Sequence, residues 1–403
     1  MKIFFSVGEP SGDLHGANLI REMSQRDPTI QFVGFGGPRM DRAGCELLFD
    51  LTSLAVMWIA RVLWNIRTFF KLLKQADEYF EQHKPDAVVL IDYPGFNWWV
   101  ARKAKKHGIP VFYYGVPQMW AWAGWRIKKM RRLVDHALCK LPFEEKWYND
   151  RGCKATFVGH PYYDEMETQQ LDVDFVNEQE QGERLVTILP GSRTQEVVNN
   201  IDWLIETAEK VYRDCPDTKF AIASFNEKQA ALAQEALEGK ELPINVFVGR
   251  TPELIKAAHC CMACSGSVSL ELLHHRKPTV ILYRVSRLFY YVASNFVATV
   301  KYITLVNLLA DDDPFTSKPV VYDPKAPGAD QVPFPEYPTW ENKSDQLATH
   351  LVQWLTDEDE YARRVALLTD LKQRFGASGA SRRAAQYILD RLVLAESDSR
   401  KAA

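Results

Sequence analysis

Short apolar runs alternate with stretches of helical periodicity along the first 160 residues. Runs of this length between helices indicate parallel strands that are covered on both faces of a sheet. The first run, KIFFSVGEPSGD (2–13), ends in a turn that leads into a helix from about Leu14. The other strand candidates are 31–38, 86–97, 109–117, 136–143 and 155–161.

The same alternation restarts after a polar, acidic stretch at 161–183. Helices such as 196–213 and 227–238 separate the new strand candidates, which are 184–193, 219–225, 244–249, 259–267 and 278–284. We therefore expect an α/β protein of the Rossmann type, with two parallel-sheet domains facing a cleft beyond the carboxyl ends of the strands. The predicted domains are 1–165 and 166–375, and helices at about 375–395 are candidates to pack back on the first domain.

A Pro-rich tract at 311–338 shows neither the apolar run of a strand nor the periodicity of a helix. We interpret it as a long loop, which in a compact domain is functional or disordered. Helical character returns from Lys343 and continues to about Ala395.

The segment Met57–Lys74 combines many large apolar residues with four charges, all positive. One stripe at helical spacing suffices to hold a helix on its own domain, and it consists of Ile59, Val62, Leu63, Ile66, Phe69, Phe70 and Leu73. Further apolar residues lie off this stripe, among Arg and Lys: Met57, Trp58, Trp64 and Leu72. Trp beside Lys and Arg is typical of a helix at a membrane interface. An unusually apolar buried helix is the alternative.

Composition and charge add three points. A chain of 403 residues exceeds one ordinary core, in agreement with two domains. The net charge of −3 hides an asymmetry, because residues 1–160 carry 23 Lys and Arg against 16 Asp and Glu, whereas the remainder carries 26 against 36. A basic half could meet an anionic membrane or nucleic acid. Neither a signal-peptide pattern nor a long apolar span is evident, and seven cysteines without disulfide-like spacing predict a cytosolic protein.

The stretch GEPSGD (8–13) follows the first predicted strand. Gly8 and Gly12 would let backbone N–H groups approach a ligand, and the next helix offers its positive N-terminus to an anion. The expected substrate contacts in the cleft are Glu9, Ser11, Gly12 and Asp13. An ordinary tight turn is the alternative, and the lack of GxGxxG argues against a dinucleotide.

Two stretches of the second half suit a nucleotide diphosphate. LPGSRTQE (189–196) predicts a turn with free N–H donors and an Arg whose guanidinium can donate two hydrogen bonds to a phosphate. CSGSVSLE (264–271) offers small residues that can hold phosphate oxygens and a Glu that can accept from ribose hydroxyls. Either stretch alone could be a plain helix cap, but both follow strands of one predicted sheet. The residues expected at the nucleotide are Gly191, Ser192, Arg193, Ser265, Gly266, Ser267 and Glu271.

The stretch IDYPGFN (91–97) places Asp92 at the end of a buried strand. A carboxylate that points into the cleft can act as general base towards a hydroxyl. The alternative is a structural Asp that bonds the next turn. Cys261 and Cys264 form one CxxC without a second pair, so a buried strand is favoured there over a metal site.

Many motifs, in order, resemble the lipid-A-disaccharide synthases over most of residues 1–310. These motifs are GEPSGDLHGANLIREM, FVGFGGPRMDRAGCE, LAVMWIARVL, IDYPGFN, QMWAW, FVGHP, LPGSRTQEV, CSGSVSLE and YITLVNLLA. The family consists of inverting glycosyltransferases with the GT-B architecture of two Rossmann-like domains.

The resemblance implies a reaction between two acylated sugars. UDP-2,3-diacylglucosamine would be the donor and 2,3-diacylglucosamine 1-phosphate the acceptor, giving a β-1,6-linked disaccharide 1-phosphate and UDP. Asp92 would deprotonate the acceptor 6-hydroxyl, Ser192, Arg193 and Ser267 would hold the diphosphate, Glu271 the ribose, and Asn307 would lie near the donor. Neither a metal nor another cofactor is expected.

The resemblance also implies a place in the cell and the partners met there. The protein would be peripheral on the cytoplasmic face of the inner membrane, with the phospholipid surface as partner and no nucleic acid. Residues 57–74 would enter the interface and receive acyl chains, through Met57, Trp58, Val62, Trp64, Ile66, Phe69, Phe70, Leu72 and Leu73.

This sequence departs from the family pattern at Val306, where Pro is usual, at Gly95, where relatives can carry a side chain, and in most of 311–335, which looks like an insertion. Two other functions stay open from the residues alone. One is another GT-B-like UDP-sugar enzyme such as a UDP-N-acetylglucosamine 2-epimerase. The other is an inactive sugar-nucleotide-binding protein docked on a membrane.

Overall fold

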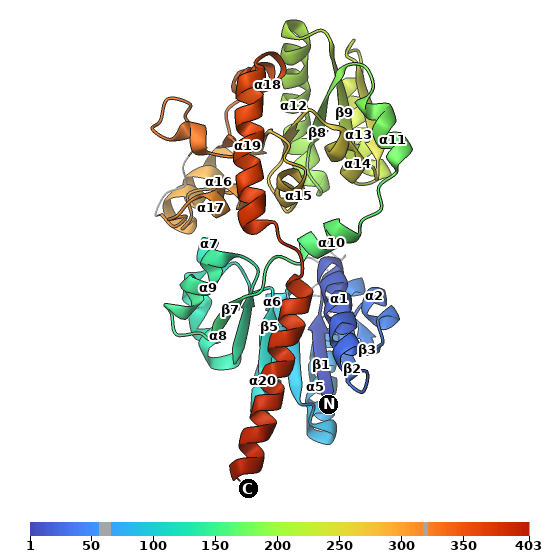
Figure 1. Cartoon of the computed structure of the whole chain (residues 1–403), viewed down its shortest axis with the longest axis vertical. Helices are drawn as coiled ribbons and strands as arrows, with labels where there is room; N and C mark the ends of the chain where they lie inside the picture. The colour runs from blue at the N-terminus through green and yellow to red at the C-terminus, as the bar shows by residue number, and fades with distance from the viewer. Residues whose placement is uncertain (56–65, 317–320, 403) are drawn as a thin grey trace. The chain divides into compact units, whose positions relative to one another are not determined.

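The chain forms two compact α/β units (Figure 1). The computed structural model describes residues 1–55, 66–316 and 321–402. Unit 1 comprises Met1–Glu165 and Ser378–Ala403, and unit 2 comprises Met166–Ala377. The chain therefore leaves unit 1 once and returns to it with its last helix.

Unit 1 is built on a parallel sheet of seven described strands in the order β3-β2-β1-β4-β5-β6-β7. The strands are β1 (Lys2–Val7), β2 (Gln31–Gly36), β3 (Cys45–Asp50), β4 (Ala87–Ile91), β5 (Val111–Tyr114), β6 (His136–Cys139) and β7 (Ala155–Phe157). Strand β3 was not among the sequence predictions. It lies at the edge of the sheet, and only Cys45 of its six residues is buried, so it lacks the continuous apolar run of a central strand.

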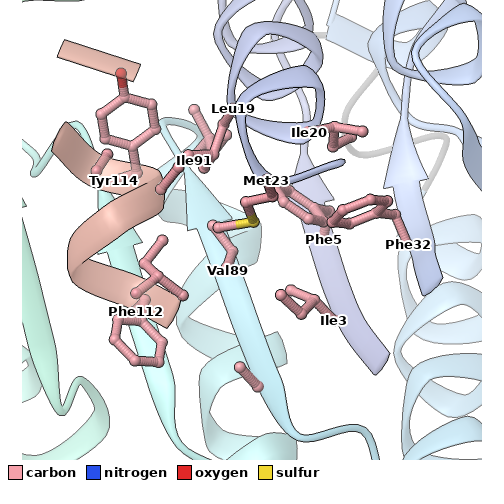
Figure 2. Packing of buried hydrophobic residues seen from close by; sticks show 14 of the residues in the cluster. Ile3, Phe5, Leu19, Ile20, Met23, Phe32, Val89, Ile91, Phe112 and Tyr114 are labelled. Carbon is pink, nitrogen blue, oxygen red and sulfur yellow. The ribbon is translucent and has the colours of Figure 1, made fainter. Parts of the chain in front are cut away.

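Helices cover both faces of this sheet. They are α1 (Pro10–Arg26), α2 (Pro38–Arg42), α3 (Thr52–Ala55), α5 (Ile66–His83), α6 (Pro94–Lys106), α7 (Met119–Trp122), η1 (Gly124–Arg126), α8 (Ile127–Leu133), α9 (Pro142–Asn149) and α20 (Ala380–Ala402); α10 (Tyr162–Thr168) contains the boundary between the units. Helices α1 and α20 lie side by side, and their apolar residues form one core with β1, β4 and β5 (Figures 1 and 2). The C-terminal helix thus completes the core of the N-terminal unit.

Helix α5 packs on α6, and the two contribute aromatic contacts next to the sheet. The ring of Phe80 lies 4.8 Å from that of Phe4, and the ring of Phe69 lies 5.6 Å from that of Phe96 on α6. Leu73 is buried between these contacts. This face holds α5 on its own unit.

The expected stripe of this helix was wrong at two residues, Leu72 and Phe70. Leu72, which we placed off the stripe, is only 2% exposed, whereas Phe70, which we placed on it, is 64% exposed. The buried face runs through Leu72, Leu73, Ala76 and Phe80, a set at helical spacing that continues beyond the segment from which the stripe was derived.

Unit 2 has a parallel sheet of six described strands in the order β10-β9-β8-β11-β12-β13. The strands are β8 (Arg184–Leu189), β9 (Thr218–Ser224), β10 (Ile244–Val248), β11 (Cys260–Ala263), β12 (Thr279–Arg284) and β13 (Glu336–Thr339). The helices are α11 (Val173–Glu180), α12 (Thr194–Asp214), α13 (Glu227–Leu237), α14 (Thr251–Ala257), α15 (Val268–His274), α16 (Arg287–Val292), η2 (Ala293–Val297), α17 (Leu305–Ala310), η3 (Ala329–Gln331), α18 (Ser344–Thr356) and α19 (Glu358–Phe375). The main core lies between this sheet and the helices α12 and α18.

The Pro-rich tract is not a plain loop, which corrects the sequence prediction. It contains η3 and ends in the edge strand β13, and its residues Tyr322 and Tyr337 belong to the core of unit 2. Prolines 335 and 338 concealed the strand, because Pro is excluded from central strands but tolerated at an edge.

Each sheet has one switch point, which is the place where the strand order changes direction. In unit 1 it lies between β1 and β4, and in unit 2 between β8 and β11. Open parallel sheets bind ligands in the crevice beyond the carboxyl ends of the two strands at such a point. The segments that follow these four strands are GEP, DYP, PGSR and CSGS, which are also the motifs with candidate chemistry.

Candidate active site

Asp92 lies directly after β4, in a backbone conformation that side chains rarely adopt. Asp92 has a φ of 45° and Tyr93 a φ of 44°, so two consecutive non-glycine residues occupy the left-handed region. Each such residue costs about 1–3 kcal/mol and persists only where its surroundings enforce it. Strain of this kind is typical of functional sites.

Two buried side chains hold this turn. The Tyr113 hydroxyl donates to the Asp92 carbonyl at 2.6 Å, and Asn97 Nδ2 donates to the same oxygen at 2.8 Å. The Asn97 amide also accepts from Ser6 Oγ at 2.7 Å, which ties α6 to β1. Neither residue was predicted from the sequence, although Asn97 closes the motif IDYPGFN.

The Asp92 carboxylate pairs with a lysine from another loop. Lys140 follows β6, and its Nζ lies 3.3 Å from Asp92 Oδ1. The two side chains are 16% and 21% exposed, so the pair is partly accessible. Asp92 Oδ1 is therefore paired across the edge of the sheet, and the role of Asp92 as general base stays a prediction. Lys140 was not predicted from the sequence.

The first turn of α1 lies against Asp92. A Cβ added to Gly12 would lie 2.9 Å from Val7 Cγ1 and 3.7 Å from Asp92 Oδ2, so glycine permits a close approach of the helix to the carboxylate. A Cβ on Gly8 would overlap the ring of Tyr93. Ser11 is exposed at this turn, and Glu9 is close enough to raise the pKa of Tyr93, after the larger effect of burial.

Asp13 has a structural role in unit 1, and the substrate contact expected of it stays a prediction. It is 2% exposed, and its carboxylate accepts backbone N–H groups from Gly37, Arg39 and Met40, each at 3.0 Å. These groups belong to the start of α2, whose first N–H groups have no partner within the helix. Asp13 therefore caps α2.

Two histidines near Asp92 and Lys140 are held neutral. Burial lowers the pKa of His15 to about 4, and it lowers the pKa of His160 well below its usual range, since a buried imidazolium is poorly solvated. The Lys140 ammonium behaves differently. Burial by itself would lower its pKa, but the Asp92 and Glu144 carboxylates outweigh this effect and raise it.

In unit 2, the loop after β8 is already occupied by an internal carboxylate. The backbone N–H groups of Ser192 and Arg193 both donate to Glu196 Oε2 at 3.1 Å, and Arg193 Nη1 pairs with Glu196 Oε1 at 2.7 Å. The donors that we expected to be free are therefore engaged in this structure. A Cβ on Gly191, which has a φ of 128°, would lie 2.5 Å from Glu196 Cβ, so glycine makes this arrangement possible.

The loops after β8 and β11 meet through Asn200. Its Nδ2 donates to the Glu196 carbonyl at 2.8 Å and lies 3.5 Å from Cys264 Sγ, while its Oδ1 accepts from Arg284 N at 3.0 Å. Asn200 is 1% exposed. A buried amide thus holds the ends of neighbouring strands together beside the two predicted phosphate-binding segments.

Residues of the loop after β11 differ in accessibility. Gly266 and Ser267 are exposed, and Ser265 Oγ donates to the Ile303 carbonyl at 3.2 Å. Glu271 is 3% exposed, so a ribose could contact it only after its covering residues move, and its role stays a prediction. Among the described residues, no three His, Cys, Asp or Glu side chains gather as a metal site would require.

Asn307 is bound within unit 2 in this structure, and its expected place near the donor stays a prediction. It is 1% exposed, its Nδ2 donates to the Phe334 carbonyl at 2.8 Å and to Glu336 Oε2 at 3.0 Å, and its Oδ1 accepts from Phe334 N at 3.0 Å. Glu336 also accepts from the N–H groups of Ile303 and Thr304. Asn307 and Glu336 therefore anchor the 303–307 segment to β13.

The structure describes only part of the residues that were predicted to contact acyl chains. Met57, Trp58, Val62 and Trp64 lie outside the described residues, as does the side chain of Ile66. Leu72 and Leu73 are buried and Phe69 is partly buried, so these three pack within unit 1, and Phe70 is the exposed one among the described members of the set. In the described part of the chain, no helix has the length and apolarity needed to cross a membrane.

Comparison with known proteins identifies the family. A sequence model described as "Lipid-A-disaccharide synthetase" matches residues 3–317. The chain belongs to this family. It is 32% identical over 395 residues to the lipid-A-disaccharide synthase of Trichlorobacter lovleyi, an alignment that covers 96% of this chain and 97% of the relative. With the synthase of Geobacter sulfurreducens the identity is 33% over 394 residues, covering 97% of each.

Membership makes this chain an enzyme of lipid A biosynthesis, a glycosyltransferase that forms the lipid A disaccharide. The two parallel-sheet units have the GT-B architecture. A UDP-GlcNAc 2-epimerase from Neisseria meningitidis, solved bound to UDP-GlcNAc, has a similar fold, with a TM-score of 0.62 at 13% identity over 97% of this chain and 100% of the other. Such a likeness shows the fold alone, so sequence, and not fold, separates this family from the epimerases.

Proposed function

We propose that the enzyme transfers the sugar of UDP-2,3-diacylglucosamine to the 6-hydroxyl of 2,3-diacylglucosamine 1-phosphate. The O6–H proton passes to Asp92, O6 forms a bond to C1 of the donor from the opposite face, and the bond from C1 to the diphosphate oxygen breaks. The products are the β-1,6-linked disaccharide 1-phosphate and UDP. The observation that carries this proposal is the partly exposed Asp92 carboxylate, in a strained turn at the switch point of unit 1.

The donor diphosphate is assigned to the switch point of unit 2. Its oxygens would replace the Glu196 carboxylate on the Ser192 and Arg193 N–H groups, and the 81% exposed Arg193 guanidinium would turn to them. The exposed Gly266 and Ser267 at the neighbouring strand would complete the cradle. Arg193 and these N–H groups would offset the charge on departing UDP, so the proposal includes no metal ion.

With acylated substrates, the enzyme would act as a peripheral protein at the cytoplasmic face of the inner membrane. Unit 1 has exposed aromatic side chains beside positive charge: Phe70 is 64% exposed on α5 next to exposed Lys71, and Trp99 on α6 stacks under Arg102 at 4.6 Å. Trp125 is 68% exposed and lies 5.1 Å from the Arg126 guanidinium. Residues 93–134 contain no Asp or Glu, which favours an anionic lipid surface as partner.

Incubation of the pure protein with both acylated substrates tests the reaction. We expect UDP and the disaccharide 1-phosphate in equal amounts, unchanged by EDTA, and formed about 10²–10⁴-fold more slowly by the Asp92→Asn variant. Release of UDP without disaccharide, or epimerisation of UDP-N-acetylglucosamine when no acceptor is present, would contradict the proposal.

A further inference from the structure

Lys140 reaches the catalytic carboxylate from two strands away. Strands β4, β5 and β6 are neighbours in that order, and the lysine side chain runs from the end of β6 across the end of β5 to the end of β4. The side chain passes directly beside Gly115, which follows β5: a Cβ there would lie in van der Waals contact, 3.4 Å from Lys140 Cδ, Cε and Nζ. The glycine has a φ of 72°, which other residues rarely adopt.

The backbone of Lys140 is held as firmly as its side chain. Its N–H donates to Glu144 Oε2 at 2.9 Å, and the N–H of Leu141 donates to the same atom at 3.0 Å. The other oxygen, Glu144 Oε1, accepts from Trp120 Nε1 at 2.9 Å. Both Glu144 and Trp120 are almost fully buried, so this network fixes the origin of the lysine side chain.

The two carboxylate oxygens of Asp92 have different surroundings. Oδ1 accepts from Lys140, whereas Oδ2 lies beside Gly12 in the first turn of α1, where the absence of a side chain leaves room. A base that abstracts a proton needs one oxygen directed at the hydroxyl and a carboxylate that does not rotate away.

From this geometry we propose that Lys140 is a positioning residue for the transfer reaction: it holds Asp92 through Oδ1 so that Oδ2 faces the acceptor hydroxyl at the N-terminal turn of α1. The inference rests on the proposed function of Asp92. In the reaction the O6–H bond breaks and a bond from hydrogen to Oδ2 forms, while the bond from Lys140 to Oδ1 persists. The other charged or titratable groups that interact with the pair include Glu9, His15, Tyr113, Tyr114, Glu144 and His160.

Replacing Lys140 by methionine keeps a chain that reaches the Cε position and removes the ammonium group with its charge. We expect kcat to fall about 10- to 100-fold, the range caused by small misplacements of a catalytic group, with the KM for the donor within about twofold. Lys140→Arg should restore most of kcat, because it returns a cation to Oδ1. The matched control is Lys146→Met, which removes a lysine from a 2.7 Å ion pair with Asp150 on the same unit and should leave kcat unchanged.

A double-mutant cycle separates positioning from a merely structural role. If Lys140 acts through Asp92, the Lys140→Met change should cost nothing further in an Asp92→Asn background. Losses that multiply in the double variant, or a kcat for Lys140→Met within threefold of wild type, would overturn the inference. If Lys140→Met does not fold, as judged by its melting temperature and UDP affinity, Lys140→Gln takes its place in the same cycle. Absence of transfer in the wild-type enzyme would instead refute the proposed function itself.

Discussion

Phe70 and Leu72 lie two positions apart on α5, and they should respond in opposite ways to the loss of their side chains. Leu72 is 2% exposed and belongs to the core of unit 1, whereas Phe70 is 64% exposed. Replacing a buried leucine by alanine costs about 2–5 kcal/mol, since it leaves a cavity. We therefore expect Leu72→Ala to lower the melting temperature and the urea midpoint clearly, with membrane binding unchanged in the folded fraction.

Phe70→Ser should show the reverse pattern. An exposed substitution usually changes stability by less than about 0.5 kcal/mol. Complete burial of such a side chain contributes about 1.5–3 kcal/mol, and because 64% of Phe70 is still exposed, about 1–2 kcal/mol remains to be gained in a membrane. Partition into vesicles should thus weaken about 5- to 30-fold.

Sedimentation with vesicles that contain anionic phospholipid measures the partition, and thermal and urea unfolding measure stability. Because Arg67, Lys71 and Lys74 remain exposed in both variants, their residual binding should decrease as salt is added. The reasoning would be refuted if Phe70→Ser lost more stability than Leu72→Ala, or if Leu72→Ala weakened vesicle binding and left stability intact.

Three further outcomes follow from the two sites. Asp92→Asn should keep UDP affinity and lose about 10²–10⁴ in kcat, and near-normal turnover would remove Asp92 from the role of base. Arg193→Ala should weaken UDP binding, measured by calorimetry, about 5- to 100-fold. The variant loses a charge-assisted bond to the diphosphate of about 1.5–3 kcal/mol, but its ion pair with Glu196, about 0.3–0.5 kcal/mol, no longer has to break. Arg213→Ala, at the far end of α12, is the control and should leave UDP affinity unchanged. Burial raises the pKa of Glu336 from 4.5 to about 7, so the folded state binds this proton more tightly and stability should fall as pH rises from about 4.5 to 7. Between pH 4.5 and 7, the free energy of unfolding of Glu336→Gln should rise by up to about 3 kcal/mol relative to that of the wild type. Parallel curves of unfolding free energy against pH for the two proteins would contradict the raised pKa of Glu336.

The alternation of strands and helices could be predicted from the sequence, because central strands of a parallel sheet are buried on both faces. Their apolar runs are continuous, as in β1 and β4, and need no knowledge of their neighbours. The same reasoning placed Asp92 after such a strand, where side chains reach the carboxyl edge. It missed β3 and β13, since an edge strand is partly exposed or carries proline and so lacks that signal.

Only the tertiary structure decided which side chains meet. Local periodicity contains no information on strand order, and strand order brings Lys140 to Asp92 across 48 residues and Asp13 to the start of α2. For the same reason the buried face of α5 could be predicted only approximately, because the stripe that packs depends on what α6 and the sheet present to it. The residue types that can do chemistry are therefore set by the sequence, whereas their roles as base, cap or anchor depend on contacts that the fold creates.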